Sequence, residues 1–258
     1  MSKPLILVTN DDGISSPGIR FLINIMNDIG DVVVVAPDSP QSGMGHAITL
    51  ESTIRCDKVI IDKGPQVEYS CSGTPADCVK LAVYKLLGRK PDLCVSGINH
   101  GSNSSINVIY SGTMSAALEG ALEGIPSIGF SLLDYSHDAD FSESEYYVRK
   151  ITNLVLKNKL EKGICLNVNI PKFIKDSKLK GIKICRQANA NWKEEFQERK
   201  DPKGRTYYWL TGQFINYDSG NDSDEWALEN RYVSIVPIQF DLTAYKTIDS
   251  LKDIFKNE

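Results

Sequence analysis

The N-terminal half of the chain alternates between short apolar runs and segments with helical periodicity. Residues 5–9 form a β-capable run, and the apolar residues after Pro17 follow the spacing of one helix face, at Ile19, Leu22, Ile23 and Met26. The nearly all-valine run 31–36 is typical of a strand covered on both faces. A strand, a helix and a second strand predict a right-handed crossover in a parallel sheet.

The same alternation recurs twice before residue 132. Segments 75–87 and 113–122 each carry an apolar stripe at helical spacing, and each precedes a strand-like run, at 91–95 and 127–132. The predicted fold class is therefore α/β, a Rossmann-like doubly wound sheet that is mainly parallel.

Residues 47–72 interrupt this alternation. Their alternating and β-branched stretches are split at Lys63-Gly64-Pro65, which predicts a β-ribbon excursion from the sheet. We interpret residues 1–132, ribbon included, as a Rossmann-like core. Residues 133–258 are interpreted as a C-terminal α+β extension that completes the sheet.

The extension has a less regular pattern than the core. A polar loop is expected around 134–144 and turns at 218–224, and residues 192–209 are rich in charge and aromatics. The expected elements are a helix at 145–157, strands at 165–170, 182–185 and 232–238, and a closing amphipathic helix marked by Tyr245, Ile248, Leu251, Ile254 and Phe255.

Composition narrows the class of protein. The 258 residues are 41% hydrophobic and 24% charged, a balance that supports a folded core. No run approaches the roughly 18 consecutive apolar residues of a membrane helix, and the start of the chain, Met1 to Pro4, has no signal-peptide pattern. The net charge of −4 disfavours binding to a nucleic acid polymer. We expect a cytoplasmic protein without a membrane partner.

The six cysteines show no paired short spacing of a zinc or redox site. Several lie in apolar runs, which favours buried free thiols. They are Cys56, Cys71, Cys78, Cys94, Cys165 and Cys185.

Three segments with unusual polar chemistry follow predicted strands. The first strand runs into Asn10-Asp11-Asp12-Gly13, where the glycine lets both carboxylates face one ion. Loop 37–46 is rich in small and hydroxyl residues, and segment 96–105 leads toward the helix near Thr113. Ligands of an open parallel sheet collect beyond the carboxyl ends of its strands. Taken alone, Asn-Asp-Asp-Gly is only a turn, so the expectation depends on the three segments meeting.

Together these segments offer two carboxylates, a hydroxyl and an amide. Such hard oxygen ligands suit Mg²⁺, Mn²⁺ or Ca²⁺ rather than a metal that prefers thiolate or imidazole. Backbone N–H groups and hydroxyls at the start of the helix after Tyr110 form an anion-binding arrangement. A phosphate monoester fits this combination better than an apolar ligand.

Five segments of the chain stand out in this order: TNDDGISSPGI, VVAPDSPQSGMGHAIT, SGTPADCVKLA, PDLCVSGINHGSN and YSGTMSAALEGAL. They resemble the successive signature segments of the SurE family, the 5′-nucleotidase "survival" proteins. The resemblance is strong over roughly the first half of the chain, and beyond it only length and strand pattern are similar.

The resemblance implies hydrolysis of nucleoside 5′- and 3′-monophosphates with one divalent ion per subunit, Mg²⁺ or Mn²⁺ and also Ca²⁺. It also implies a homodimer or homotetramer that exchanges C-terminal elements. The family's metal ligands correspond to Asp11, Asp12, Ser42 and Asn99, and its phosphate-binding positions to Asn103, Ser111, Gly112 and Thr113.

The predicted catalytic residues are Asp11 and Asp12. We expect Asp11 to orient or deprotonate the attacking water, and a covalent aspartyl-phosphate is the competing mechanism.

Three other functions remain to be weighed. A haloacid dehalogenase-like phosphatase needs two aspartates separated by one residue, whereas Asp11 and Asp12 are adjacent. A dinucleotide oxidoreductase needs a glycine fingerprint after the first strand, and this chain has acidic residues there. A non-catalytic nucleotide sensor that uses the same pocket stays open.

Single residues outside these segments have simpler interpretations. For His46 a surface or packing role is favoured over donation to the leaving oxygen, and Lys80 and Glu119 are expected on solvated helix faces. Thr74 is expected to cap a helix, with Pro75 in its first turn and Asp77 near its positive end.

Four aromatic residues have two possible roles. They could stack on a base or lie in an oligomer interface, and the interface is favoured. These residues are Trp192, Tyr207, Tyr208 and Trp209.

Overall fold

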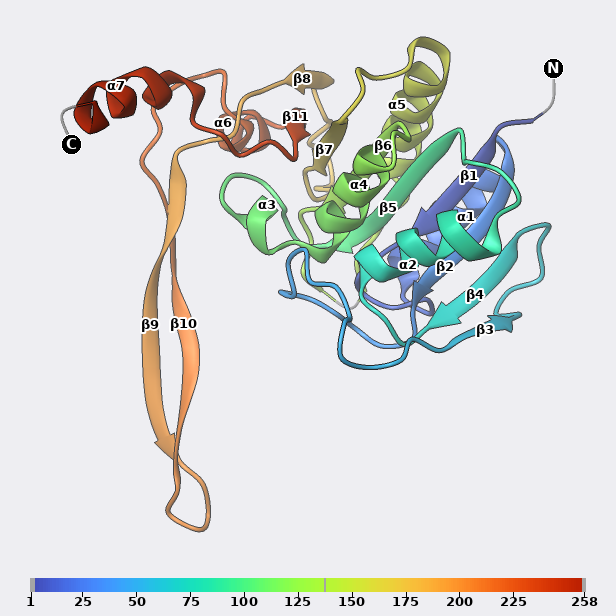
Figure 1. Ribbon diagram of the computed structural model, residues 1–258, viewed down its shortest axis with the longest axis horizontal. Helices are drawn as coiled ribbons and strands as arrows, with labels where there is room; N and C mark the ends of the chain where they lie inside the picture. Colours follow the sequence, from blue (N-terminus) through green and yellow to red (C-terminus); the bar gives the residue numbers. More distant parts are fainter. Residues whose placement is uncertain (1–2, 137, 257–258) are drawn as a thin grey trace.

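A computed structural model describes residues 3–136 and 138–256, so Met1, Ser2, His137, Asn257 and Glu258 lie outside the described residues. One nine-stranded sheet runs through the body in the order β3-β4-β2-β1-β5-β6-β7-β11-β8, and β9 and β10 form a separate two-stranded sheet (Figure 1). Helices cover the large sheet, which confirms the predicted α/β class.

The centre of the large sheet is parallel. Each neighbouring pair in the series β4-β2-β1-β5-β6-β7 runs in the same direction. The carboxyl ends of these strands therefore lie at one edge of the sheet. In chain order the strands are β1 (Leu5–Thr9), β2 (Asp31–Pro37), β4 (Val67–Cys71), β5 (Leu93–His100), β6 (Ser127–Leu132) and β7 (Ile164–Ile170).

Short strands complete the two sides of the sheet. β3 (Cys56–Val59) pairs antiparallel with β4. On the other side β11 (Val233–Gln239) is antiparallel to β7, and β8 (Ile182–Ile184) is parallel to β11. Strands from both halves of the chain thus share one sheet.

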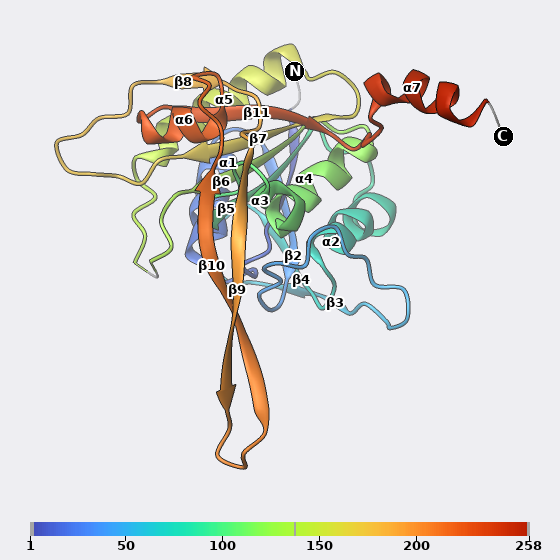
Figure 2. The same cartoon turned by 90° about the vertical axis from the view of Figure 1, so that its left-hand side faces the viewer.

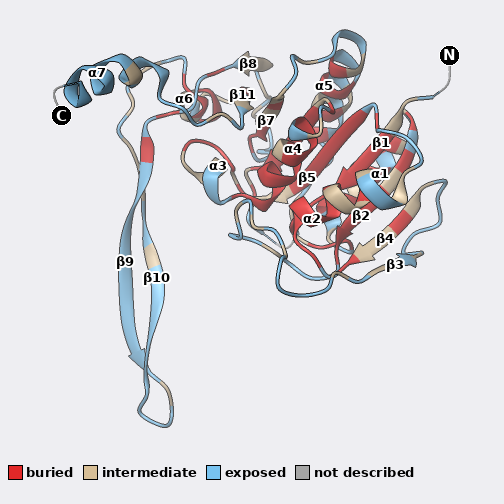
Figure 3. Ribbon diagram, in the orientation of Figure 1, coloured by how far each residue is buried: buried red, intermediate tan, exposed pale blue. Residues whose placement is uncertain are grey.

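Helices bury both faces of the sheet, as Figure 3 shows by the red strands between them. On one face α1 (Pro17–Asn27) and α5 (Ser144–Asn158) pack against alternate strand residues such as Ile6 and Val8. On the other face α2 (Pro75–Leu81) and α4 (Gly112–Leu122) pack against Leu7 and its neighbours. Since both faces are covered, the strands are continuously apolar rather than alternating.

The C-terminal part extends beyond this body. β9 (Ala190–Lys200) and β10 (Thr206–Asn216) form a long hairpin that projects away from the sheet (Figure 2). The last helix, α7 (Tyr245–Phe255), also lies apart from the body, with Ile248 half-buried and its other residues exposed (Figure 1). Two short helices, α3 (Asn107–Tyr110) and α6 (Asp224–Glu229), were not predicted.

The predicted β-ribbon excursion at 47–72 was wrong in its extent and position. Only residues 56–59 and 67–71 form strands, and they are part of the main sheet. β4 pairs with Val33–Pro37 of β2, so the ribbon covers an edge that would otherwise expose unpaired backbone groups.

Two other segments differ from the prediction, the first in helix type and the second in where its strand ends. The helix predicted over 75–87 continues after α2 as a π-helical turn, η1 (Ala82–Leu86), and the N–H of Leu87 donates to the carbonyl of Ala82 at 2.9 Å. The strand predicted to end at Val95 continues to His100, because Asn99 and His100 pair with Ser131 and Leu132 of β6 after a register shift. Buried backbone groups need such partners.

Other expectations were confirmed. Thr74 caps α2 in a capping box: its hydroxyl accepts from the N–H of Asp77 at 3.2 Å, and the Asp77 carboxylate accepts from the N–H of Thr74 at 2.9 Å. The six cysteines are free thiols, of which five are buried and Cys56 is half-buried. Within residues 3–136 and 138–256, no helix combines the length and apolar composition needed to cross a membrane.

Candidate functional site

The carboxyl ends of β2, β1 and β5 bring the three predicted segments together. β1 lies between the other two strands and pairs in parallel with both. A cleft of about 230 Å³ opens at this edge of the sheet. Five of the predicted site residues line it, namely Asp11, Ser42, Asn99, Asn103 and Ser111. The interpretation of Asn-Asp-Asp-Gly as a simple turn therefore does not account for this region, because the other two predicted segments lie beside it.

Asp11 is the most enclosed acid of the cleft. Its side chain accepts a hydrogen bond from the Thr113 hydroxyl, and its backbone carbonyl accepts from the N–H of Gln41 at 2.7 Å. Burial raises the pKa of Asp11 from 3.8 to about 6, and the charge of neighbouring Asp12 acts in the same direction. A buried carboxylate beside a second carboxylate is the environment that a cation stabilises.

The remaining predicted metal ligands surround Asp11. Asp12 is half-buried, its carboxylate accepts from the N–H of His100 at 3.3 Å, and burial raises its pKa. The Asn99 amide N–H donates to the carbonyl of Gly101 at 2.9 Å, so the side-chain oxygen is the atom that Asn99 can offer to a cation. Ser42 is exposed at the mouth of the cleft.

The donor set fits a hard divalent cation. Over the described part of the chain, no group of three or more His, Cys, Asp or Glu side chains has an arrangement that could hold a metal ion. Two carboxylates completed by a hydroxyl and an amide oxygen suit Mg²⁺, Mn²⁺ or Ca²⁺.

The start of α4 packs beside Asp11 at the cleft. Ser111 is the N-cap, and its hydroxyl accepts from the N–H of Met114 at 3.0 Å. Gly112 is the first residue of the helix and lies directly against Asp11, since a Cβ added there would be 2.6 Å from the Asp11 Cβ. The positive end of an 11-residue helix thus faces the two carboxylates.

Asn103 is held by residues that the sequence did not single out. Its N–H donates to the side-chain oxygen of Asn169 at 2.8 Å, and its carbonyl accepts from the Asn167 amide at 2.8 Å. Its own amide donates to the Ser131 hydroxyl at 2.8 Å, which leaves a second amide hydrogen for a ligand. The sequence does contain a signal for these contacts, a pair of asparagines at alternate positions of the otherwise apolar run 164–170. Buried polar side chains in such a run need hydrogen-bond partners.

The prediction of a solvated helix face was wrong for Glu119. This residue is buried, and its carboxylate contacts the Lys80 ammonium at 2.7 Å and the His46 ring at 2.8 Å. Burial raises the pKa of Glu119, but the hydrogen bonds from His46 and Lys80 lower it below the usual value. α2 and the loop after β2 cover this side of α4, which periodicity alone does not reveal. Through this contact His46 connects the loop that carries Ser42 to α4, and its packing role stays a prediction.

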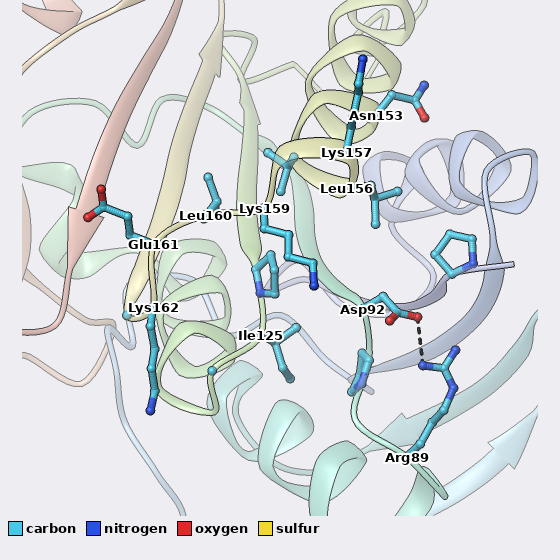
Figure 4. A pocket seen from close by; sticks show the side chains of 16 residues that line it. Arg89, Asp92, Ile125, Asn153, Leu156, Lys157, Lys159, Leu160, Glu161 and Lys162 are labelled. Atoms are coloured by element: carbon cyan, nitrogen blue, oxygen red, sulfur yellow. Dashed lines mark hydrogen bonds and ion pairs between the residues drawn. The ribbon is translucent and has the colours of Figure 1, made fainter. Parts of the chain in front are cut away.

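A larger pocket lies elsewhere. It measures about 1100 Å³ and is lined by residues that precede strands, among them Pro4, Asp92 and Gly163. It therefore lies at the amino ends of the parallel strands. Figure 4 shows that the lysines labelled there point in different directions, while Asp92 pairs with Arg89 at 2.9 Å. Charges do not converge in this pocket as they do at Asp11.

The contact of Gly112 with Asp11 carries a testable prediction. We expect Gly112→Ala to displace Asp11 and to lower phosphate release from a phosphate monoester by at least about tenfold, since active sites tolerate little misplacement. The matched control is Gly88→Ala, because a Cβ at Gly88 meets no atom within 4 Å. Steady-state kinetics and thermal unfolding of both variants would check it. Equal activity of the two variants would show that the contact is not needed.

Comparisons with known proteins show what the whole chain is similar to. The family model described as "Survival protein SurE" matches residues 6–194. The chain is similar to the 5′-nucleotidase SurE of Christiangramia forsetii, at 65% identity over 99% of this chain and 98% of that protein. The corresponding protein of Flavobacterium psychrophilum is 64% identical over 98% of each chain. A crystal structure of the SurE protein from Aquifex aeolicus matches with a TM-score of 0.83 and 40% identity, over 97% of this chain and 99% of that chain.

Proposed function

The chain belongs to the SurE family, and on this premise we propose that it is a metal-dependent nucleotidase that hydrolyses nucleoside 5′-monophosphates, and also 3′-monophosphates, to nucleoside and phosphate. The observation that carries the proposal is the buried Asp11, which follows β1 next to Asp12 and contacts the positive end of α4 at a cleft that Ser42, Asn99 and Asn103 also line. Curated relatives named 5′-nucleotidase, at 62–65% identity, support the same activity.

We assign the cation to Asp11, Asp12, Ser42 and Asn99. A divalent ion at this position supplies Lewis acidity toward the phosphoryl oxygens. Asp11 orients or deprotonates the attacking water, and an aspartyl-phosphate formed on it is the competing route.

The phosphate is assigned to Asn103 and to the start of α4. Asn103 offers its second amide hydrogen, and Gly112 at the positive end of α4 and the Ser111 hydroxyl are assigned to the anion with it. Because the Thr113 hydroxyl already donates to Asp11, its side chain positions that carboxylate. These groups at Asn103 and the start of α4 would therefore stabilise the negative charge that develops on the phosphoryl group.

The test is phosphate release from a panel of 5′- and 3′-nucleoside monophosphates with Mg²⁺, Mn²⁺ and Ca²⁺. We expect turnover of the nucleotides with at least one of these ions. A chain that binds nucleotides by calorimetry but releases no phosphate with any ion would be the non-catalytic sensor instead.

We also propose that residues 133–258 supply the interface of a homodimer or homotetramer. Large apolar side chains are exposed along the hairpin, including Phe196, Trp209 and Leu210, and on α7, including Ile254 and Phe255. Exposed apolar surface on elements that project from the body is typical of an interaction surface. The aromatic residues near the tip of the hairpin, Tyr207, Tyr208 and Trp209, fit this role.

The double substitution of Ile254→Asp and Phe255→Asp tests the interface. It places two charges on the apolar side of α7, and we expect a smaller assembly because buried unpaired charges are costly. The control is Ser250→Asp, at an exposed polar position of the same helix. Light scattering after size-exclusion chromatography would measure the mass. An unchanged assembly in the double variant would remove α7 from the interface.

A further inference from the structure

The root of the long hairpin reaches the cleft. Trp192 lies near the start of β9, pairs with Phe214 of β10, and lines the same cleft as Asp11 and Ser42. The aromatic residues farther along the hairpin, such as Trp209, do not line this cleft among the described residues. The structure thus separates Trp192 from the set that was assigned as a whole to an interface.

The indole of Trp192 is held in one orientation. Its ring N–H donates to the Asn107 side-chain oxygen at 2.8 Å, and its ring meets Phe214 with centroids 5.4 Å apart at 61°. The residue nevertheless stays 41% exposed. Because its polar atom is already paired, the surface that Trp192 offers to the cleft is aromatic.

Two tyrosines continue this aromatic lining. Tyr110 and Tyr135 also line the cleft and are 51% and 74% exposed. Tyr135 is held in place, because a Cβ at Gly101 would lie 2.2 Å from its ring and its hydroxyl accepts from the N–H of Ser102 at 3.3 Å. The cleft therefore combines a buried acidic end at Asp11 with an exposed aromatic end.

We propose that Trp192 is the stacking platform for the nucleobase of the substrate. The inference rests on the proposed function, which places the phosphoryl group at the acidic end of the cleft. A planar base next to a fixed and exposed indole gains stacking energy without reordering the protein. The larger rings of purines cover more of the indole than pyrimidines do, so the platform favours purine nucleoside monophosphates. An ester without an aromatic group gains nothing from it.

The test compares AMP with glycerol phosphate in the Trp192→Ala and Trp192→Phe variants with Mn²⁺. We expect Trp192→Ala to raise KM for AMP by about 10- to 100-fold, the range of one base–aromatic stack, while KM for glycerol phosphate stays constant. Trp192→Phe keeps a stacking face and should restore most of the affinity for AMP. The matched control is Trp209→Ala, an exposed tryptophan on the same hairpin outside the cleft.

Calorimetry with adenosine gives a second readout that needs no turnover. Adenosine should bind more weakly to Trp192→Ala than to the unmodified chain, by a factor similar to the change in KM. If the unmodified chain releases no phosphate from any ester but binds adenosine through Trp192, the proposed function fails and the platform stands. Equal losses for AMP and glycerol phosphate would overturn the platform. An equal effect of Trp209→Ala would do the same.

Discussion

Asp11→Asn is expected to abolish most of the phosphate release while leaving the fold intact. The amide has the size of the carboxylate and can still accept the hydrogen bond from Thr113, but it removes one of the two charges that face a cation. It also removes the group assigned to orient or deprotonate the water. A loss of about 10²- to 10⁴-fold in kcat is the usual range for such a group.

The variant should not lose stability when the ion is absent. The folded-state pKa of Asp11, about 6, lies above the ordinary value of 3.8 because of burial and the charge of Asp12. The ionised carboxylate therefore lowers the stability of the ion-free fold at pH values above about 6, and this cost vanishes as the pH falls below 3.8. We expect the Tm of Asp11→Asn at neutral pH to equal or exceed that of the unmodified chain.

The matched control is Asp38→Asn. Asp38 is an exposed acid on the neighbouring loop, so the substitution changes the net charge equally without touching the cleft. Kinetics with AMP and Mn²⁺ and thermal unfolding would compare the two variants. Near-normal turnover of Asp11→Asn would exclude the assigned role, and a similar loss in Asp38→Asn would point to a general effect of charge.

Removal of divalent ions is expected to have a comparably large effect. With a chelator, the two carboxylates face each other and the incoming phosphate without a compensating charge, so hydrolysis should fall to the uncatalysed background. Addition of Mn²⁺ in excess over the chelator should restore it. The ion should also raise the Tm, because a ligand present at about 100 times its Kd stabilises the fold by about 2.7 kcal/mol.

Asp11→Asn and Asp12→Asn test whether this stabilisation arises at the assigned position. Each variant should show a weaker Tm increase with Mn²⁺ than the unmodified chain, while Asp38→Asn should show the full increase. Hydrolysis that persists in the chelator would contradict metal dependence. An undiminished Tm increase in both cleft variants would place the ion elsewhere.

Much of the fold could be predicted because the spacing of apolar residues along a helix or strand indicates which of its faces is buried. The stripe Ile19, Leu22, Ile23 and Met26 is the buried face of α1, and the valine run is β2 between two helical layers. The candidate site was predictable for a similar reason. Once three parallel strands are recognised, the residues after them must lie at one edge of the sheet.

Features that depend on partners distant in the chain could not be predicted. The strand extension through Asn99 requires β6 beside it, and the burial of Glu119 requires Lys80 and His46 from other elements. Neither requirement leaves a periodic signal near the residue itself. The same holds for Asn169, whose side-chain oxygen accepts hydrogen bonds from the N–H of Asn103 and from the Ser102 hydroxyl, both distant in the chain.

The sequence by itself determined the class of fold, the edge of the sheet where the candidate site lies, and the acidic and hydroxyl groups available there. Only the tertiary structure decided that Gly112 presses α4 against Asp11, that the β-ribbon joins the sheet, and that Trp192 reaches the cleft from the hairpin. The spacing of apolar and polar residues indicates which face of each helix or strand is buried and which is exposed to water. Which surfaces then meet is decided by the packing of whole elements against one another.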